Sequence, residues 1–433
     1  MKKSGFMNLI PKISRIISKF TSLKNRCDCS MNDMSKIAHK AIFQPKEAMA
    51  SVGKSRHTLK IGVPKEISFQ EKRIPLTPLS VALLIEYGHE VIIESGAGEA
   101  SNFLDTHYSE QGARISHDKQ EVFQCDIVIK IASPTLEEVN MMKNKQVLLS
   151  SHQPSLMKLP VLQALMRKQI TAVSYEYLQD EGGHLTVVRA MSEIVGATSV
   201  LIAAEYLSNI FDGKGLMLGG ITGVPPTEMV IIGAGTVGEY AARAAIALGA
   251  QVKVFDSSVY RLRRLQNNVG SRVFTSVIQP IVLNKAVRSC DVVIGAVRAT
   301  NGRSPCIISE DTVSKMKPNS VLIDVSIDQG GCFETSEVTT HDKPVFRKYD
   351  VIHYCVPNIA SRVARTATYA LTNIMTPLLL QIGECGGMNN MIWSDKCIRS
   401  AIYLYQGMLT NKDIAEKFNL PLKDLDLIIV ANQ

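Results

Sequence analysis

Three glycines with a fixed spacing mark the segment of this chain whose chemistry is easiest to infer. Gly233, Gly235 and Gly238 form a GxGxxG pattern in VIIGAGTVGEYAARAAIALGA, between an apolar run and an alanine-rich helical pattern. The first glycine allows a tight turn, the second lets backbone approach a pyrophosphate, and the third lets the helix pack closely on the strand. The N-terminus of that helix offers free N–H groups to phosphates. The segment therefore predicts a dinucleotide site, the alternative being a purely structural glycine turn.

An acidic residue beyond the glycines indicates which dinucleotide binds. Asp256 ends the next apolar run, QVKVFD, where a carboxylate accepts hydrogen bonds from the adenine ribose hydroxyls. A carboxylate at this position disfavours an additional 2′-phosphate, so we expect NAD rather than NADP as the cofactor. Arg261, Arg263 and Arg264 follow and weaken that preference.

A second carboxylate and an arginine are candidates for the reaction itself. In IDVSIDQGGCFE, a predicted strand ends at Asp328, and an amide and two glycines follow. Open α/β sheets bind ligands at the carboxyl ends of their strands, and glycines let ligand atoms approach the backbone. Arg73, in QEKRIPLTP, has a planar fork that matches a carboxylate. The alternatives are a helix N-cap or turn acid for Asp328 and an exposed loop arginine for Arg73.

These residues need a scaffold, and the sequence predicts one of alternating strands and helices. Short apolar runs alternate with helical patterns from Leu59 on, as in LKIGVPKE, GHEVIIESGAG, VFQCDIVIKIASP, KQVLLSSHQ and ITAVSYEYLQD. The long helical pattern MSEIVGATSVLIAAEYLSNIF and the loop GKGLMLGGITGVPP precede a second set of such runs. This alternation predicts an α/β protein with two Rossmann-like domains and parallel sheets.

The second glycine-rich unit lies inside the chain, which suggests that the C-terminal helices return to the first domain. We therefore predict a basic leader at 1–58, a discontinuous substrate domain at 59–188 and 362–433, and an NAD-binding Rossmann domain at 189–361. The tail from Thr366 is predicted to be mainly helical, with NKDIAEKFN as a short amphipathic helix.

Composition and charge exclude several classes of protein. The 433 residues suggest two or three domains, and 45% hydrophobic with 20% charged residues is typical of soluble globular proteins. The net charge of +8 comes mostly from the first 30 residues, which hold seven basic residues and one acid, Asp28. The remaining body is nearly neutral, so we expect no nucleic-acid surface. No uncharged apolar stretch of about 18 residues is present, so we expect no membrane span.

The leader and the cysteines bear on cellular location. The start MKKSGFMNLIPKISRIISKF fits a transit peptide, a membrane-surface helix, or a disordered or mis-assigned start with Met31 and Met34 as alternative beginnings. Nine scattered cysteines predict reduced thiols, and the lone CxC of Cys27 and Cys29 has no partner pair at metal spacing. We expect a cytoplasmic protein, imported into an organelle if the leader is a transit peptide, and no metal site.

Several motifs together resemble the alanine dehydrogenase and transhydrogenase NAD-binding-subunit family. They are IGVPKE with Arg73 downstream, GHEVIIESGAG, AMSEIVG, GGITGVPP, VIIGAGTVG, IDVSIDQGGCFE, and HYCVPNIAS with TATYALTN. The resemblance covers about residues 59–425. It implies two α/β domains joined by helices with the active site in the cleft between them, and a homo-oligomer. The activity it implies is reversible NAD-dependent oxidation of L-alanine to pyruvate and ammonia.

The same resemblance leaves a second function open. Transhydrogenase subunits of this family bind NAD(H) and pass hydride to a partner that binds NADP, as part of a proton-translocating enzyme. The end of the chain at LIIVANQ, without a hydrophobic extension, favours a free enzyme over such a subunit. A regulatory NADH sensor is a third possibility.

The resemblance also assigns roles to individual residues. Asp328 matches the acid that orients or activates the water attacking the imino carbon, and Arg73 matches an arginine that binds the substrate carboxylate. Four further positions match cofactor contacts: Ser192, Arg261, Val356 and Asn358.

Two positions depart from the family's pattern. An ungapped alignment pairs the family's catalytic histidine with Gln153, which leaves His152 one residue out of register. A one-residue shift reverses a strand's facing direction, but a loop adjustment at the strand end could restore His152 as the general acid/base. The family's substrate lysine pairs with Ala132, and Lys130 lies two residues earlier on the same strand face, about 6–7 Å back. Lys130 could stretch forward to bind substrate, or be a structural side chain with a buried stem.

Overall fold

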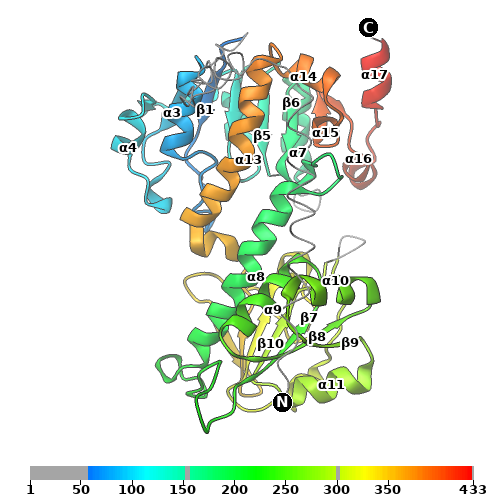
Figure 1. Ribbon diagram of the computed structural model, residues 1–433. Coiled ribbons are helices and arrows are strands. Elements are labelled where there is room, and N and C mark those ends of the chain that lie inside the picture. Colours follow the sequence, from blue (N-terminus) through cyan, green and yellow to red (C-terminus); the bar gives the residue numbers. More distant parts are fainter. Residues whose placement is uncertain (1–56, 152–156, 299–302, 432–433) are drawn as a thin grey trace, which may run out of the picture. The chain divides into compact units, whose positions relative to one another are not determined.

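Two mostly parallel sheets form the scaffold in the computed structural model of this chain (Figure 1). The structure describes residues 57–151, 157–298 and 303–431. The predicted α/β fold with two parallel-sheet units is therefore confirmed. The domain boundaries predicted above stay predictions.

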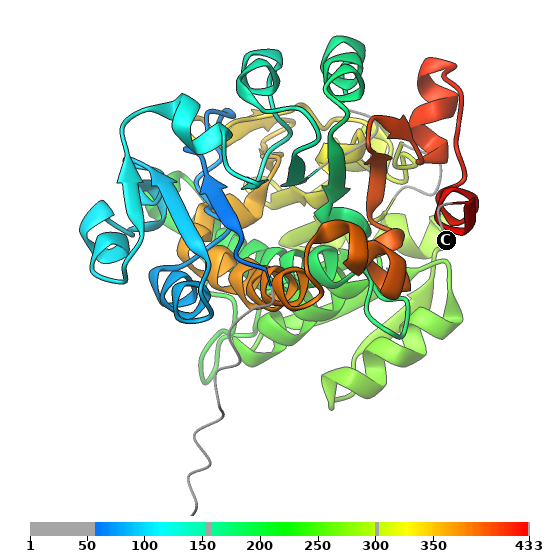
Figure 2. The same ribbon diagram turned by 90° about the horizontal axis from the view of Figure 1, so that it is seen from above.

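Eight strands in the described residues form the first sheet, in the order β15-β14-β6-β5-β4-β1-β2-β3. The strands are β1 (Lys60–Val63), β2 (Glu90–Glu94), β3 (Arg114–Ser116), β4 (Ile127–Ile129), β5 (Val147–Ser150), β6 (Thr171–Ser174), β14 (Ile402–Tyr405) and β15 (Met408–Leu409). Strands β1 to β6 pair in parallel, whereas β14 runs antiparallel to β6. The C-terminal segment thus extends this sheet, and its orange-red strand lies beside a green one in Figure 2.

Helices connect these strands and cover them. They are α3 (Pro78–Glu86), α4 (Asp105–Ser109), α5 (Lys119–Phe123), α6 (Leu136–Met141), α7 (Leu159–Arg167), α13 (Ala364–Glu384), α14 (Met388–Ser394), α15 (Lys396–Arg399), α16 (Lys412–Phe418) and α17 (Leu425–Ala431). Several begin at capping residues in the sequence. Thr77 accepts the N–H of Ser80 ahead of α3, and Asn411 accepts the N–H of Ile414 at the start of α16, the helix predicted from NKDIAEKFN.

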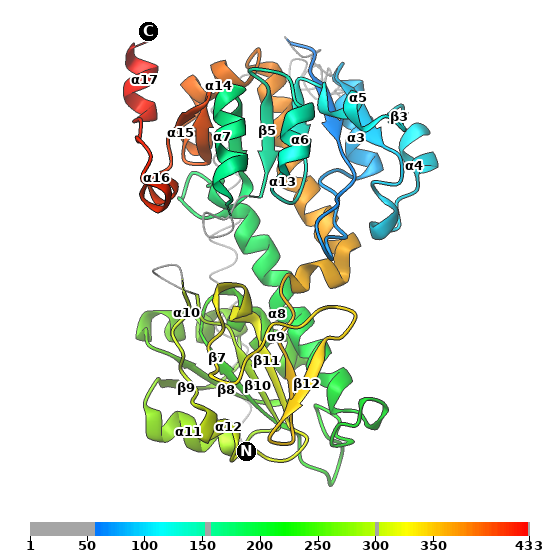
Figure 3. The same cartoon turned by 180° about the vertical axis from the view of Figure 1, so that it is seen from behind.

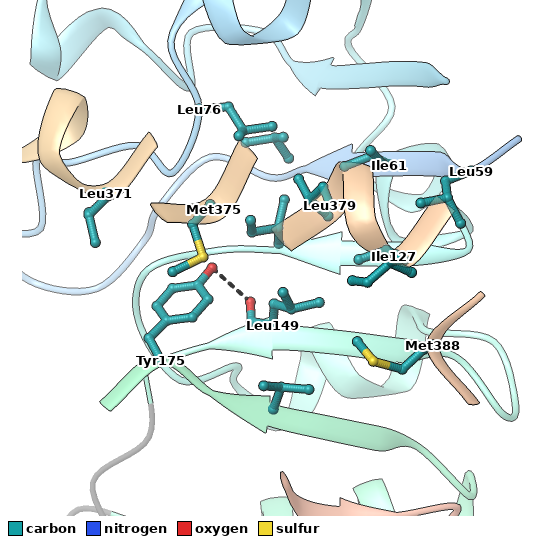
Figure 4. Packing of buried hydrophobic residues seen from close by; sticks show 14 of the residues in the cluster. Leu59, Ile61, Leu76, Ile127, Leu149, Tyr175, Leu371, Met375, Leu379 and Met388 are labelled. Carbon is teal, nitrogen blue, oxygen red and sulfur yellow. Dashed lines mark hydrogen bonds between the residues drawn. The ribbon is translucent and has the colours of Figure 1, made fainter. Parts of the chain in front are cut away.

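Apolar side chains of the strands and of α13 form the core of this sheet (Figure 4). Ile61 and Leu149 are fully buried, as are Met375 and Leu379 of α13. Each such side chain contributes about 1.5–3 kcal/mol to folding relative to an exposed one. The hydroxyl of the buried Tyr175 donates to the carbonyl of Leu149 at 3.1 Å, so the aromatic ring is buried without an unsatisfied polar group.

Seven strands in the described residues form the second sheet, in the order β12-β13-β11-β10-β7-β8-β9 (Figure 3). Its strands are β7 (Glu228–Ile232), β8 (Gln251–Asp256), β9 (Phe274–Val277), β10 (Val292–Gly295), β11 (Val321–Asp324), β12 (Val345–Lys348) and β13 (Val351–Tyr354). Its helices are α9 (Thr236–Ala247), α10 (Val259–Val269), α11 (Pro280–Ser289) and α12 (Glu310–Val313). The strand order reverses at β7, between β8 and β10, and ligands bind doubly wound sheets outside such a reversal point.

The long helix α8 (Thr186–Leu207) lies between β6 and β7 in the chain and packs closely on α9. A Cβ on Gly196 would lie 2.4 Å from the carbonyl oxygen of Val237, so only glycine allows this approach. By length and composition alone α8 could cross a membrane, with a mean hydropathy of 1.6 over a window that is 39% buried. The core helix of a water-soluble protein passes the same test, so this is weak evidence for a span.

The strand predicted to end at Asp328 ends four residues earlier, and this prediction was wrong. β11 stops at Asp324, and the 3₁₀ turn η4 (Val325–Gln329) follows. The buried carboxylate of Asp324 accepts the backbone N–H groups of Ser326 and Cys332, both at 2.9 Å, and so turns the chain out of the sheet. Asp328 therefore projects from a turn beyond the strand.

Candidate active site

Two of the three glycines of the GxGxxG segment are required for steric reasons, and the third leaves open space. Gly233 has a φ of +111°, and a Cβ on it would lie 2.2 Å from the carbonyl oxygen of Ala296. A Cβ on Gly238 would lie 1.8 Å from the carbonyl oxygen of Gly233. Gly235 is the N-cap of α9, and a Cβ there would meet no atom of the described residues within 4 Å. The space beside Gly235 is where a pyrophosphate could approach the helix N-terminus.

Asp256 is the last residue of β8 and holds the glycine turn in place. Its buried carboxylate accepts the N–H of Ala234 and the N–H of Ser258, each at 2.7 Å. A carboxylate offers about four acceptor positions, so two remain for ribose hydroxyls. Arg261 is exposed, with its Nη1 4.0 Å from this carboxylate, and the Nη2 of Arg264 lies 3.5 Å from the carbonyl oxygen of Ala234.

Asp328 is an ionisable group in a partly enclosed position on η4. The backbone N–H of Asn358 donates to its carboxylate. Surrounding protein atoms desolvate the carboxylate and raise its pKa to about 6, although the residue remains accessible to solvent. The positive charge of Arg73 lowers the pKa of Asp328, whereas the negative charge of the nearby Glu176 raises it further. Asp328 and Arg73, predicted from segments far apart in the sequence, are thus close enough to interact electrostatically.

Arg73 is engaged by a carboxylate of its own loop, which the sequence prediction did not foresee. Its Nε donates to Glu71 Oε1 at 2.7 Å and its Nη2 to Glu71 Oε2 at 2.6 Å. The two side chains are only 13% and 6% exposed. Burial disfavours the guanidinium charge, but the Glu71 carboxylate outweighs burial and raises the pKa of Arg73. The third nitrogen, Nη1, faces the sulfur of Met191 on α8 at 3.4 Å.

Asn358 joins this pair to Asp328. It lies between β13 and the 3₁₀ turn η5 (Ile359–Val363) in the left-handed region, with φ 55° and ψ 48°. Its side-chain Nδ2 donates to Glu71 Oε2 at 3.0 Å while its backbone N–H donates to Asp328. Val356, the other residue predicted near the nicotinamide, is buried in the core of the second sheet. Ser192 is half-buried on α8, next to Met191.

Lys130 lies just beyond β4 in a buried ionic cluster. Its Nζ is 2.8 Å from Glu138 Oε2 and 3.7 Å from Glu66 Oε2, and its side chain is 1% exposed. Glu138 also pairs with Lys119 at 3.2 Å. The geometry favours the structural interpretation of Lys130, and its substrate-binding role stays a prediction.

Glu66 is a second residue that sequence reasoning missed. Its carboxylate accepts the N–H groups of Ile131 and Ala132 at the end of β4. Burial raises the pKa of Glu66 to about 7, although Lys130 and the two N–H groups lower it. The signal was available, because Glu66 follows the apolar run IGVP at a strand's carboxyl end, the same pattern that singled out Asp328.

The predicted histidine and the expected absence of a metal site are the remaining points. His152, the predicted general acid/base, and Gln153 lie outside the described residues. In the ranges that the structure describes, no three or more histidine, cysteine or acidic residues gather as a metal site would require.

Comparison with known proteins adds information about relatedness. The model of the family "Alanine dehydrogenase/PNT, N-terminal domain" matches residues 62–195, and that of "Alanine dehydrogenase/PNT, C-terminal domain" matches residues 199–412. The chain is 38% identical over 365 residues to the alanine dehydrogenase of Mycolicibacterium smegmatis, covering 84% of this chain and 98% of that protein.

Solved structures give the same result for the fold. An L-alanine dehydrogenase structure matches with 35% identity and a TM-score of 0.79, over 83% of this chain and 99% of its own. A transhydrogenase from Sinorhizobium meliloti matches with 21% identity and a TM-score of 0.69, over 81% of this chain and 98% of its own. At that lower identity the likeness concerns the fold alone.

Proposed function

Because this chain belongs to the alanine dehydrogenase/PNT family, we propose that it oxidises L-alanine to pyruvate and ammonia in a reversible, NAD-dependent reaction. One observation carries the proposal beyond family membership. A hydrogen-bonded series runs from Arg73 through Glu71 and Asn358 to Asp328. The series brings the Arg73 guanidinium, which can bind a substrate carboxylate, near the side chain of Asp328, which is ionised at neutral pH. An amino-acid dehydrogenase requires both groups.

The glycine turn of the second sheet fits NAD, which this family binds. Gly235 leaves room beside the helix N-terminus, and Asp256 retains two acceptor positions. Gly233 and Gly238 keep the turn tight enough for that arrangement. When bound, NAD accepts the hydride that leaves Cα of the amino acid.

Arg73 is the residue that we propose to bind the substrate carboxylate. Its Nε–Nη2 edge is taken by Glu71, whereas the one acceptor that Nη1 meets in the described part of the chain is a thioether, which is a weak acceptor. A substrate carboxylate could therefore bind at the Nη1–Nη2 edge in a charge-assisted pair. The low exposure of Arg73 strengthens such a pair, because little water competes for it.

Asp328 is the residue that we propose to act on water and protons. Above its pKa of about 6 the carboxylate is ionised, so it can hold a water molecule and accept a proton from it. It can also stabilise positive charge that develops on the substrate nitrogen. His152 remains our second candidate for the proton acceptor.

The test is steady-state kinetics on the purified protein. We expect NADH production from NAD with L-alanine, and consumption of NADH with pyruvate only when ammonium is present. The Asp328→Asn variant should lose about 10²–10⁴-fold in kcat and still bind NADH. In the wild type, kcat/KM should fall as pH decreases through about 6, because Asp328 is then protonated. Binding of NADH without turnover of L-alanine would contradict the proposal and favour an NAD(H)-binding subunit.

Assembly and location are part of the proposal. We propose a homo-oligomer, which light scattering on the purified protein can test. We also propose a cytoplasmic location, with organelle import as the alternative if residues 1–58 act as a transit peptide.

A further inference from the structure

The guanidinium of Arg73 has one edge occupied and one edge available. Of its nitrogens, Nε and Nη2 form a side-on pair with Glu71 at 2.7 and 2.6 Å. An arginine has five N–H donors in a rigid plane, so this pair fixes the plane and the direction of the other edge. Among the residues that the structure describes, the only hydrogen-bond partner of that other edge, Nη1 and Nη2, apart from Glu71 is the sulfur of Met191, 3.4 Å from Nη1.

Glu71 is held by more than the guanidinium. Its Oε1 also accepts the backbone N–H of Arg73 at 3.0 Å, and its Oε2 accepts Nδ2 of Asn358 at 3.0 Å. With its side chain 6% exposed, Glu71 is oriented by protein groups rather than by water. Its orientation, and with it that of Arg73, therefore depends on where Asn358 lies.

Asn358 is placed to transmit that orientation. Its left-handed backbone conformation is one that asparagine and glycine adopt more readily than other residues. A second contact fastens the same two segments. The hydroxyl of Ser361 accepts the N–H of Lys72 at 2.9 Å and donates to the carbonyl of Gln70 at 2.8 Å. The loop that carries Arg73 is thus fixed to the turn whose Asn358 backbone N–H binds Asp328.

We propose that Glu71 is a positioning residue that aims the free edge of Arg73 at the substrate carboxylate and, through Asn358, sets Arg73 relative to Asp328. This inference rests on the proposed function. The opposite role would be that of an internal competitor, with Glu71 occupying the place of the substrate carboxylate. The two roles predict opposite changes in substrate affinity when Glu71 is neutralised.

The first variant is Glu71→Gln, which keeps the size of the side chain but removes its charge and one acceptor oxygen. The KM for L-alanine should rise about tenfold or more, because the guanidinium loses its fixed direction, while the KM for NAD stays within about twofold. Lys72→Ala is the matched control, since Lys72 is an exposed neighbour that takes part only through its backbone. A fall in the KM for L-alanine would overturn the proposal in favour of a competitor.

The second variant, Asn358→Gly, tests whether the side chain of Asn358 orients Glu71. Glycine keeps the left-handed backbone and the N–H that binds Asp328, but it lacks the amide that binds Glu71. We expect the KM for L-alanine to rise about threefold. In the double variant with Glu71→Gln, the KM should rise by less than the product of the two single-variant increases. If the increases in KM simply multiply, Glu71 and Asn358 act independently, and the proposed role of Asn358 in orienting Glu71 is wrong.

A binding measurement separates this inference from the proposed activity. Pyruvate is titrated into the NADH complex of each protein, with NADH fluorescence as the signal. If the wild type binds pyruvate but does not turn over L-alanine, the proposed function fails, yet the dissociation constants still test the positioning role. Weaker pyruvate binding by about tenfold in Glu71→Gln supports that role. Unchanged or tighter binding overturns it. Asn358→Gly serves for the same titration if Glu71→Gln does not fold.

Discussion

The carboxyl edges of the two sheets are built on different physical principles. At the edge of the second sheet, the glycine turn presents backbone and open space, and the buried Asp256 satisfies two N–H groups of the turn itself. At the edge of the first sheet, buried side chains of opposite charge hold one another, as Lys130 does with Glu138 and Arg73 with Glu71. One edge depends on steric fit and the other on charge balance. Substitutions at the two edges should therefore fail in different ways.

Gly238→Ala should have the largest effect on stability and on NADH binding, because it introduces a steric clash at the glycine turn. The new Cβ would lie 1.8 Å from a backbone oxygen, so α9 must move away from β7. We expect loss of measurable NADH binding and a decrease of roughly 2–5 kcal/mol in the free energy of unfolding. Fluorescence titration and urea unfolding measure the two quantities. Gly235→Ala is the matched control, since its Cβ meets no atom of the residues that the structure describes, and it should weaken NADH binding while leaving stability nearly unchanged.

Lys130→Met should have the next largest effect, because it removes a charge from the other edge. Two nearly buried carboxylates, Glu138 and Glu66, would lose their shared cation. Breaking a buried pair costs about 3–5 kcal/mol, to be measured by urea unfolding. Lys143→Met is the control, since Lys143 forms an exposed pair with Asp126 and should change stability by less than about 1 kcal/mol. Unchanged stability with a raised KM for L-alanine would instead assign Lys130 to the substrate.

The same contrast explains how much of the molecule could be predicted from sequence. The glycine turn was readable because its requirements are local: a strand, three glycines and a helix lie within one short segment. The apolar runs likewise marked strands of both sheets, but they missed the short strands β3, β9 and β12, and the two strands β14 and β15 lie in the tail that was predicted to be mainly helical. The error at Asp328 arose because the end of β11 is set by the side chain of Asp324, which binds Cys332 eight residues further along the chain.

The charged edge was harder to predict because its partners are distant in sequence. The bond from Asn358 to Glu71 joins residues 287 positions apart, and that from Ile131 to Glu66 joins residues 65 positions apart. Arg73 was recognised by its type, but the sequence gives no signal that Glu71 takes one edge of its guanidinium. Side-chain pairing of this kind follows from the tertiary arrangement of the strands.

Glu66→Gln should change the pH dependence of stability rather than abolish folding. Folded Glu66 has a pKa of about 7 against an ordinary 4.5, so the native state keeps a proton that the unfolded chain releases. The free energy of unfolding should therefore fall as pH rises from about 4.5 to 7, by about 3 kcal/mol at most from this group. Glutamine has no such proton, so the difference between variant and wild type should grow over that range.

Urea unfolding at pH 5 and pH 8 measures this effect. Glu99→Gln is the control, because Glu99 is 61% exposed and should leave the pH profile parallel to that of the wild type. A parallel profile for Glu66→Gln as well would mean that Glu66 is ionised in the folded protein, and that the charge balance around Lys130 differs from the one described.

Arg261→Ala should have the smallest effect, and it tests whether charge matters at the glycine turn at all. Arg261 is 54% exposed, and its Nη1 lies 4.0 Å from Asp256 Oδ2, so solvent screens the pair. Exposed pairs contribute about 0–1 kcal/mol, which limits the change in NADH dissociation constant to about fivefold. Fluorescence titration with NADH and with NADPH gives both affinities. If removal of this one charge shifted NADH binding more than tenfold, or reversed the preference between the two cofactors, the second sheet's edge would depend on charge as the first one does. Steric fit at the glycines would then explain only part of the NADH affinity.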